Sequence, residues 1–297
     1  MRCRGAKHSG RIGLLAAFWG AAVAIWVASA PAQGLDTPKP DVVSIGGSIT
    51  EIVYALGQAE RLVARDTTST YPPEAKTLPD VGYMRALSPE GVLSVGPELI
   101  LAEEGAGPPE AIEVLKSAGV PIVGLPEVLS AEGVARKIRD VGAALGVPAE
   151  ADVLAAQVEA DMAAAHARAA RRAGEEPKKV LFVLSMQGGR VLASGRGTAA
   201  DAIIRLAGGV NAVAEIEGYK TLTDEAVSRA APDVILMMDR EGDHAISDEV
   251  IFSMPAFMPT PAARDGAIVR MDGLFMLGFG PRTAEAVDAL SASLYGS

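Results

Sequence analysis

The chain has 297 residues and an acidic balance, with 37 Asp and Glu against 27 Lys and Arg and a formal net charge of −10. This balance excludes the basic surface that nucleic-acid binding requires, so we expect no nucleic acid among the partners. A chain of this length can bury one large core or two medium-sized ones.

The first 32 residues have the pattern of a cleaved export signal. Four basic residues precede an apolar run over 12–28, and small residues follow with cleavage-site spacing at Ala28-Ser29-Ala30 and Ala30-Pro31-Ala32. We favour cleavage after Ala32, because the first option would leave a proline directly after the cut. An uncleaved membrane anchor is the alternative interpretation.

Removal of residues 1–32 would change both the charge and the cysteine content. The lost segment holds four of the 27 basic residues, no acidic residue and the only cysteine, Cys3. The mature chain would then carry 23 basic against 37 acidic residues, and could form no disulfide and no thiolate metal site. It would begin with a proline-rich leader at 33–40.

A long internal repeat is the clearest feature of the mature chain. Residues 87–102 return 135 positions later as residues 222–237. The pairs in register are Leu87 and Leu222, Glu90 and Glu225, Val92 and Val227, Pro97 and Pro232, and Ile100 and Ile235. Upstream, Gly82-Tyr83-Met84-Arg85 is echoed by Gly218-Tyr219-Lys220, one residue out of step with the repeat. Such a repeat predicts two lobes of similar plan, with the functional site in the cleft between them.

The first half alternates strand and helix patterns. Strands are predicted at 42–45, 62–64, 99–102 and 121–124, with helices at 50–56, where Thr50 is a possible cap, and at 109–118. This alternation is typical of a parallel sheet covered on both faces. We therefore expect an α/β lobe over 41–129.

The middle of the chain is predicted to be helical throughout 130–176. Ser130 begins a helix that ends before Gly146, and a second helix runs from Pro148 to Gly174. Its many alanines favour a rigid helix, which at about 1.5 Å per residue would be about 38 Å long. We expect this helix to join the lobes as a strut.

The second half begins the alternation again, over 177–297. We predict a strand at 180–184, a turn at 186–189, a helix at 199–207, strands at 234–237 and 268–271, and a closing helix at 281–295. The predicted fold class is α/β, with two α/β lobes of mainly parallel sheets joined by a long rigid inter-lobe helix.

This plan resembles the substrate-binding proteins of bacterial siderophore, cobalamin and haem ABC importers, in which a rigid helix joins two lobes. The segment Asp66-Thr67-Thr68-Ser69-Thr70-Tyr71-Pro72-Pro73-Glu74, the segment from Leu78 to Gly91 and the segment from Gly273 to Arg282 look like the periplasmic haemin-binding branch. The resemblance implies a periplasmic protein of iron acquisition that binds haem b as transported cargo. It also implies a permease dimer and its ATPase as partners, with an outer-membrane haem receptor system upstream.

Tyr71 is the predicted haem-iron ligand. Tyrosine is a recognised axial ligand of haem, and its phenolate suits Fe(III). Since a phenol must lose a proton to bind iron, a nearby cation helps, and the candidates are Arg65, Arg85 and Lys220. The other reading is a loop tyrosine packed against its prolines.

Further candidates for ligand binding come from the second lobe. Some haemin-binding relatives have a histidine where this chain has Met186-Gln187. Met186 is a candidate for packing on the porphyrin face, and a core methionine is the alternative. Phe279 lies in the segment that resembles the haemin-binding branch. The mature histidines, His166 in the strut and His244 on an acidic loop, are read as exposed residues. No paired metal-binding spacing is present.

The repeat also places two acidic residues in equivalent positions, Glu90 and Glu225, each at the start of a predicted helix. The resemblance implies that such a pair contacts arginines of the permease subunits. Helix capping is the alternative reason for an acid there.

Other classes of protein fit less well. No nucleophile elbow, phosphate-binding loop or dinucleotide fingerprint is present, so we do not expect an enzyme. A cobalamin or ferric-siderophore binder of the same architecture is the main alternative, and a haem scavenger with no importer is another.

Overall fold

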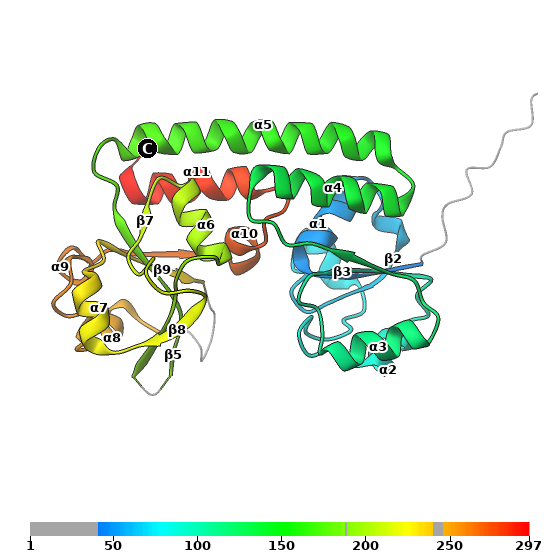
Figure 1. The fold of residues 1–297 in the computed structure, drawn as a ribbon, viewed down its shortest axis with the longest axis horizontal. Coiled ribbons are helices and arrows are strands. Elements are labelled where there is room, and N and C mark those ends of the chain that lie inside the picture. The colour runs from blue at the N-terminus through cyan, green and yellow to red at the C-terminus, as the bar shows by residue number, and fades with distance from the viewer. Residues whose placement is uncertain (1–40, 188, 240–245, 297) are drawn as a thin grey trace, which may run out of the picture. The chain divides into compact units, whose positions relative to one another are not determined.

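The computed structural model describes residues 41–187, 189–239 and 246–296 (Figure 1). The predicted signal peptide at 1–32, the leader at 33–40 and His244 lie outside the described residues. Within the described ranges, no helix is long and apolar enough to cross a membrane.

The first lobe is built on a four-stranded sheet in which every pairing is parallel. Its strands are β1 (Val42–Ile45), β2 (Leu62–Arg65), β3 (Leu99–Glu103) and β4 (Ile122–Leu125), in the order β2-β1-β3-β4. Its helices are α1 (Gly47–Ala55), α2 (Pro89–Ser94) and α3 (Pro109–Ser117), with short 3₁₀ turns at Ala59–Arg61 and Pro73–Thr77. The strands predicted from the sequence are all present, but α1 begins at Gly47, so Thr50 lies inside the helix and does not cap it.

Side chains of this sheet alternate between two apolar clusters. Val42 and Leu101 pack with α1 and the helices behind it, whereas Val43 and Ile100 pack with α2 and α3. Figure 1 shows α2 and α3 on one side of the sheet and α1 on the other. Continuous apolar strands are what burial on both faces demands.

Two helices connect the lobes, α4 (Ala131–Leu145) and α5 (Pro148–Ala173). The Ser130 side chain accepts a hydrogen bond from Gly133 N at 3.1 Å, and Gly146 ends α4 in the left-handed region with φ 77°. α5 has 26 residues, which corresponds to about 39 Å, and it lies alongside α4 and α11 (Thr283–Tyr295) (Figure 1). The predicted strut is therefore present as one continuous helix.

The second lobe has a mixed six-stranded sheet. Its strands are β5 (Lys179–Gln187), β6 (Arg190–Ser194), β7 (Val210–Asn211), β8 (Tyr219–Leu222), β9 (Val234–Met238) and β10 (Ile268–Met271). The order is β10-β9-β5-β6-β8, with β7 paired to β5; β6 is antiparallel to both of its neighbours. The helices are α6 (Ala199–Leu206), α7 (Asp224–Ala230), α8 (Asp248–Ser253), α9 (Pro261–Asp265) and α10 (Gly273–Leu277), followed by α11.

The predicted turn at 186–189 is wrong at its start. Met186 and Gln187 belong to β5, which continues in register with β6 (Met186 opposite Val191, Gln187 opposite Arg190). The two glycines at 188–189 indicate a turn in the sequence. The sequence did not reveal that β6 pairs with β5 and so extends that strand to Gln187. The fold class is otherwise as predicted, two α/β lobes joined by a long helix, with mainly parallel pairing in the second lobe.

One apolar cluster reaches through both lobes and the linker. It contains Ile49 and Ile52 of α1, Ala155 and Ala165 of α5, and Phe182 of β5, all of them fully buried. Because α5 buries small alanines on this face, α4 and α11 can approach it closely. The helix is thus packed along its length and does not act as a free linker.

Candidate functional site

A cavity of about 560 Å³ has walls from both lobes. The first lobe contributes Gly47, Ser48, Thr68, Thr70, Tyr83, Met84, Arg85, Glu103, Glu104 and Glu127, and the second contributes Leu184, Tyr219, Met238, Asp272, Gly273, Leu274, Leu277 and Gly278. Its size and mixed lining are those of a small-molecule site.

Hydrogen bonds to the buried carboxylate of Asp66 hold the loop that carries Tyr71 in place. Asp66 is fully buried, and its Oδ1 accepts hydrogen bonds from Gly46 N at 3.0 Å and from Ser69 Oγ at 2.7 Å. Its Oδ2 accepts from Thr68 N at 2.9 Å and from Thr68 Oγ1 at 2.7 Å. A carboxylate with four donors fixes the loop, and Thr68 and Thr70 face the cavity.

The network continues into the sheet. Ser69 Oγ lies 2.6 Å from Thr50 Oγ1, which lies 2.7 Å from Ser44 Oγ on β1. The first turn of α1 and the end of β1 therefore support the loop, and Thr50 serves this network.

Tyr71 follows Thr70 directly and is 40 % exposed, but it is not among the residues that line the cavity. The guanidinium carbon of Arg282 lies 3.5 Å from the centroid of its ring, and 5.1 Å from that of Phe275. Arg282 also donates two hydrogen bonds to Glu51, from Nε to Oε2 at 3.0 Å and from Nη2 to Oε1 at 2.5 Å. A residue 211 positions away in the sequence is thus stacked on the predicted ligand.

Burial raises the pKa of the Glu51 carboxyl above its usual range, and the hydrogen bonds and charge of Arg282 oppose that rise. The pKa of Arg282 is lowered by its own burial but raised overall by Glu51, with Tyr71 and Asp272 adding to the effect. The geometry of the two groups is that of a forked ion pair.

The cations expected near Tyr71 lie elsewhere. Arg65 is paired with Asp80, Nη1 to Oδ2 at 2.8 Å, and Arg85 lines the cavity beside Tyr83. Lys220 is exposed on β8 and does not line the cavity, because neighbouring strand residues point to opposite faces and Tyr219 takes the cavity side. Arg282 is the cation against Tyr71, and sequence reasoning missed it.

The other second-lobe candidates are not in the cavity wall. Phe279 is 1 % exposed and belongs to the shared core, so its side chain is a packing group rather than a ligand contact. Met186 packs against an apolar cluster of the second lobe that includes Leu181 and Val183. The side chain of Gln187 lies outside what the structure describes.

The carboxylate of Glu103, which lines the cavity, is paired with a buried lysine. Lys137 of α4 is fully buried, and its Nζ lies 2.5 Å from Glu103 Oε1, 3.0 Å from Ser48 Oγ and 3.5 Å from the carbonyl oxygen of Phe279. Ser48 Oγ also donates to Glu103 Oε1 at 2.7 Å. These contacts tie α4, β3 and the segment before α11 together beneath the site.

Two further groups in the wall have shifted pKa values. Burial raises the pKa of Glu127, with a contribution from Glu103, against the opposing charges of Lys137 and Arg85. Burial also raises the pKa of Tyr219, which Arg85 lowers and Glu127 raises. The cavity therefore holds a neutral tyrosine hydroxyl beside Arg85.

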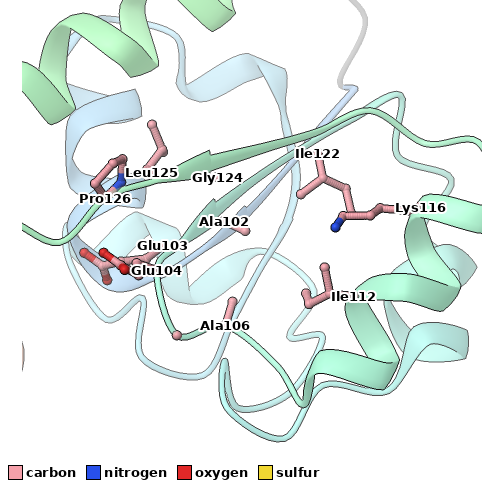
Figure 2. A pocket seen from close by; sticks show the side chains of 11 residues that line it. Ala102, Glu103, Glu104, Ala106, Ile112, Lys116, Ile122, Gly124, Leu125 and Pro126 are labelled. Carbon is pink, nitrogen blue, oxygen red and sulfur yellow. The ribbon is translucent and has the colours of Figure 1, made fainter.

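A second hollow, of about 450 Å³, adjoins the first lobe and shares Glu103 and Glu104 with the main cavity. Figure 2 shows Ile112 and Lys116 of α3 on one side of it and the two glutamates on the other. It contains none of the predicted ligand-binding residues. In the described residues no group of three or more His, Cys, Asp or Glu is arranged to hold a metal ion.

The two repeated acids occupy matching positions. Glu90 is the second residue of α2, whose Ser88 cap accepts from Gly91 N, and Glu225 is the second residue of α7, capped by Thr223. Both are exposed. Hydrogen bonds from its own backbone N–H and from Thr223 lower the pKa of Glu225, so it is ionised at neutral pH.

Comparison with known proteins covers both lobes. Residues 42–273 match the periplasmic binding protein family. The periplasmic heme-binding protein BhuT in complex with two hemes is 44 % identical over 86 % of this chain and 97 % of that chain, with a TM-score of 0.82. YvrC of Bacillus subtilis, an uncharacterised ABC transporter substrate-binding lipoprotein, is 28 % identical over 86 % of this chain and 79 % of its own length.

A vitamin B12-binding protein of Pectobacterium carotovorum is 39 % identical, but over only 82 residues. That stretch is 28 % of this chain and 30 % of the B12-binding protein. The likeness to BhuT is therefore both higher in identity and far more extensive.

Proposed function

We propose that this chain, which belongs to the periplasmic binding protein family, captures haem in the cavity between its lobes and delivers it to an ABC importer. The extent and level of its identity with a haem-binding structure support haem as the ligand. Haem is the cargo, and we propose no catalytic role for the chain.

The proposal depends on Tyr71 as the ligand of the haem iron. It is accessible, its loop is fixed by Asp66, and Arg282 lies against its ring. The guanidinium carbon of Arg282 lies 3.5 Å from the centre of the Tyr71 ring, where the positive charge is attracted to the electron-rich face. The phenolate oxygen is a hard anionic donor that suits ferric iron.

The test is a titration with haemin followed by visible absorbance. We expect a phenolate-to-iron charge-transfer band in the wild type that is lost in Tyr71→Phe, together with faster transfer of haem to apomyoglobin. Tyr54→Phe, on α1 and outside the cavity wall, is the matched control and is expected to behave as wild type. An unchanged spectrum in Tyr71→Phe would remove Tyr71 from the site.

Cobalamin is the second candidate, because a B12-binding protein matches part of the chain. Cyanocobalamin is therefore titrated in parallel with haemin. Tight cyanocobalamin binding with no haemin binding would replace the proposed ligand.

For the partners, we propose a permease dimer that contacts Glu90 in the first lobe and Glu225 in the second. The matching positions and exposure of these two acids support the proposal, as does similarity to an ABC transporter substrate-binding lipoprotein. Rim charges act mainly by speeding association, so loss of uptake should be greatest at low salt and limiting haem.

Helix capping would also select these acids, so the controls must share that role. Glu249 is exposed at the second position of α8 after a Ser247 cap, and its pKa is lowered in the same way as that of Glu225. Glu110 is exposed at the second position of α3. Docking predicts that Glu90→Gln with Glu225→Gln reduces haem uptake while Glu110→Gln with Glu249→Gln does not. Equal uptake by the two double variants would leave capping as the only role.

We also propose export to the periplasm with cleavage after Ala32, leaving lobes at 41–129 and 177–297 around the helical linker at 130–176. The N-terminal sequence of the mature protein, recovered from a periplasmic extract, tests the cleavage. A chain that starts at Met1 and stays with the membrane fraction would favour an anchor instead.

A further inference from the structure

Two tyrosines outside the predicted ligand set belong to similar Gly-Tyr pairs, one in each lobe and one residue out of register with the 135-residue repeat, Tyr83 in a loop and Tyr219 at the start of β8. Tyr83 and Tyr219 both follow a glycine in the repeated Gly-Tyr pair, and both glycines have positive φ, 101° for Gly82 and 66° for Gly218. No atom lies within 4 Å of where a Cβ would be at either glycine, so their role is the backbone turn and not close packing. The repeat thus preserves the turn that presents each tyrosine.

Both side chains line the same cavity and both are unusually exposed for large aromatic groups, 47 % for Tyr83 and 38 % for Tyr219. Within the described residues, neither hydroxyl makes a hydrogen bond of its own. Tyr295, by contrast, accepts a hydrogen bond from Lys178 N and donates one to Gly208 O. Tyr83 and Tyr219 therefore contribute little to the packing of the fold.

We propose that Tyr83 and Tyr219 form a two-sided aromatic clamp that selects a flat conjugated macrocycle. The proposal rests on the proposed function, since it assigns the pair to the ligand of the same cavity. Aromatic rings gain from offset stacking on flat π-systems, and each lobe supplies one ring. Met84 and Leu274, which also line the cavity, add apolar contact to the same surfaces.

The chemistry of the pair favours stacking over iron ligation. Burial raises the pKa of the Tyr219 hydroxyl, and Glu127 adds to that effect, which suits a neutral stacking group. Tyr71 differs from the pair because Arg282 lies on its ring. Tyr83 and Tyr219, which line the cavity, are thus assigned to stacking, and Tyr71, which follows the lining residue Thr70, is assigned to the iron.

The clamp also gives a reason for discrimination among related ligands. A porphyrin is flat, and its outer rings stay open to aromatic contact on both faces even where the iron holds an axial ligand. Cobalamin has a puckered ring with bulky groups on both faces, which would prevent a ring from each lobe from stacking on it. The pair is therefore a specificity-determining feature as well as a source of affinity.

The test uses haemin and metal-free protoporphyrin IX with the full-length mature chain. Protoporphyrin has no iron, so its binding reports stacking without Tyr71. We expect Tyr83→Ala and Tyr219→Ala each to raise the Kd for both compounds about 3- to 10-fold. Tyr83→Phe and Tyr219→Phe keep the ring and are expected to stay within about 2-fold of wild type. Tyr71→Phe should weaken haemin binding more than it weakens protoporphyrin binding.

Two results would overturn the clamp. Alanine variants that bind protoporphyrin as tightly as wild type would show that the rings make no useful contact. Phenylalanine variants as weak as the alanine variants would show that the hydroxyls, not the rings, hold the ligand. If haemin failed to bind the wild type, the proposed function would fall, and the protoporphyrin titration would still decide the clamp. Urea midpoints of all variants check that each one folds.

Discussion

The forked pair between Glu51 and Arg282 connects α1 to the start of α11, and we predict that breaking it from the arginine side destabilises the protein strongly. The carboxylate side chain is 5 % exposed and the guanidinium side chain 19 %. Arg282→Met keeps the length of the side chain but leaves the buried carboxylate without its partner. Loss of one partner of a buried pair costs about 3–5 kcal/mol.

The expected loss of unfolding free energy in Arg282→Met follows from the two contacts that Arg282 makes. Because the guanidinium is partly exposed, we take the low end, about 3 kcal/mol, for the loss of the ion pair. The contact with the ring of Tyr71, itself 40 % exposed, adds about 0.5–1 kcal/mol. Glu51→Gln should cost less, about 1–2 kcal/mol, because the amide stays uncharged and the freed guanidinium reaches water. The double variant should therefore be more stable than the sum of the single effects implies.

The pH dependence gives an independent check on the cause. Burial already raises the folded-state pKa of Glu51 above 4.5, and Arg282 lowers it, so Arg282→Met should raise it further. A folded-state pKa above the unfolded one means that the folded protein binds the proton more tightly. Unfolding free energy then falls as the pH rises from about 4.5 through the folded pKa. The deficit of Arg282→Met should thus be largest near pH 8 and smaller near pH 5.

The assay is urea unfolding of wild type, both single variants and the double variant at pH 5 and pH 8. The double variant lacks the buried carboxylate, so its deficit should not grow between pH 5 and pH 8. If the deficit of Arg282→Met were equal at the two pH values, the uncompensated charge of Glu51 would not be its cause, and the reasoning would fail.

Three further predictions follow from the packing. Small-angle scattering profiles with and without haem should nearly coincide, because bending α5 would break backbone hydrogen bonds; a large compaction on binding would contradict this. Lys137→Met should cost about 3–5 kcal/mol of unfolding free energy by stranding Glu103, and the added Glu103→Gln should recover part of it, as urea midpoints would show. Gly195→Ala should cost about 1–3 kcal/mol, since the new Cβ would lie 2.3 Å from Ile216 O, whereas Gly124→Ala, with open space around it, should change little.

Local signals account for the parts of the fold that the sequence predicts well. Ser130 and Gly146 cap α4 as expected, and α5 runs from Pro148 to Ala173 with Gly174 after it. These boundaries depend on the chemistry of a single turn, which is readable from neighbouring residues. Strands of the parallel sheets were equally clear, because burial on both faces requires continuous apolar runs.

The site was predictable only where the repeat or the resemblance pointed to it. Tyr71 and Arg85 lie at or beside the cavity, and the repeat identified the Gly-Tyr pairs without revealing that both tyrosines face one space. Arg282 was missed because its partners, Glu51 and Tyr71, are distant in the chain and no local pattern connects them. Lys220 was placed in the cleft by counting along the repeat, although the period-2 geometry of β8 turns it away.

The architecture accounts for how a ligand can be bound tightly without a large closing movement. Side chains that would otherwise need ordering are already fixed: Asp66 holds the loop of Tyr71, Glu51 holds Arg282, and Lys137 holds Glu103 in the floor. The free energy of binding is the contact energy minus the cost of ordering side chains and loops. When the side chains of the wall are already ordered in the free protein, that cost is smaller and binding is tighter. The shared core along α5 extends to both lobes, so we expect the separation of their walls to change little on binding. Discrimination must then come from the shape and chemistry of those walls rather than from how far they can close.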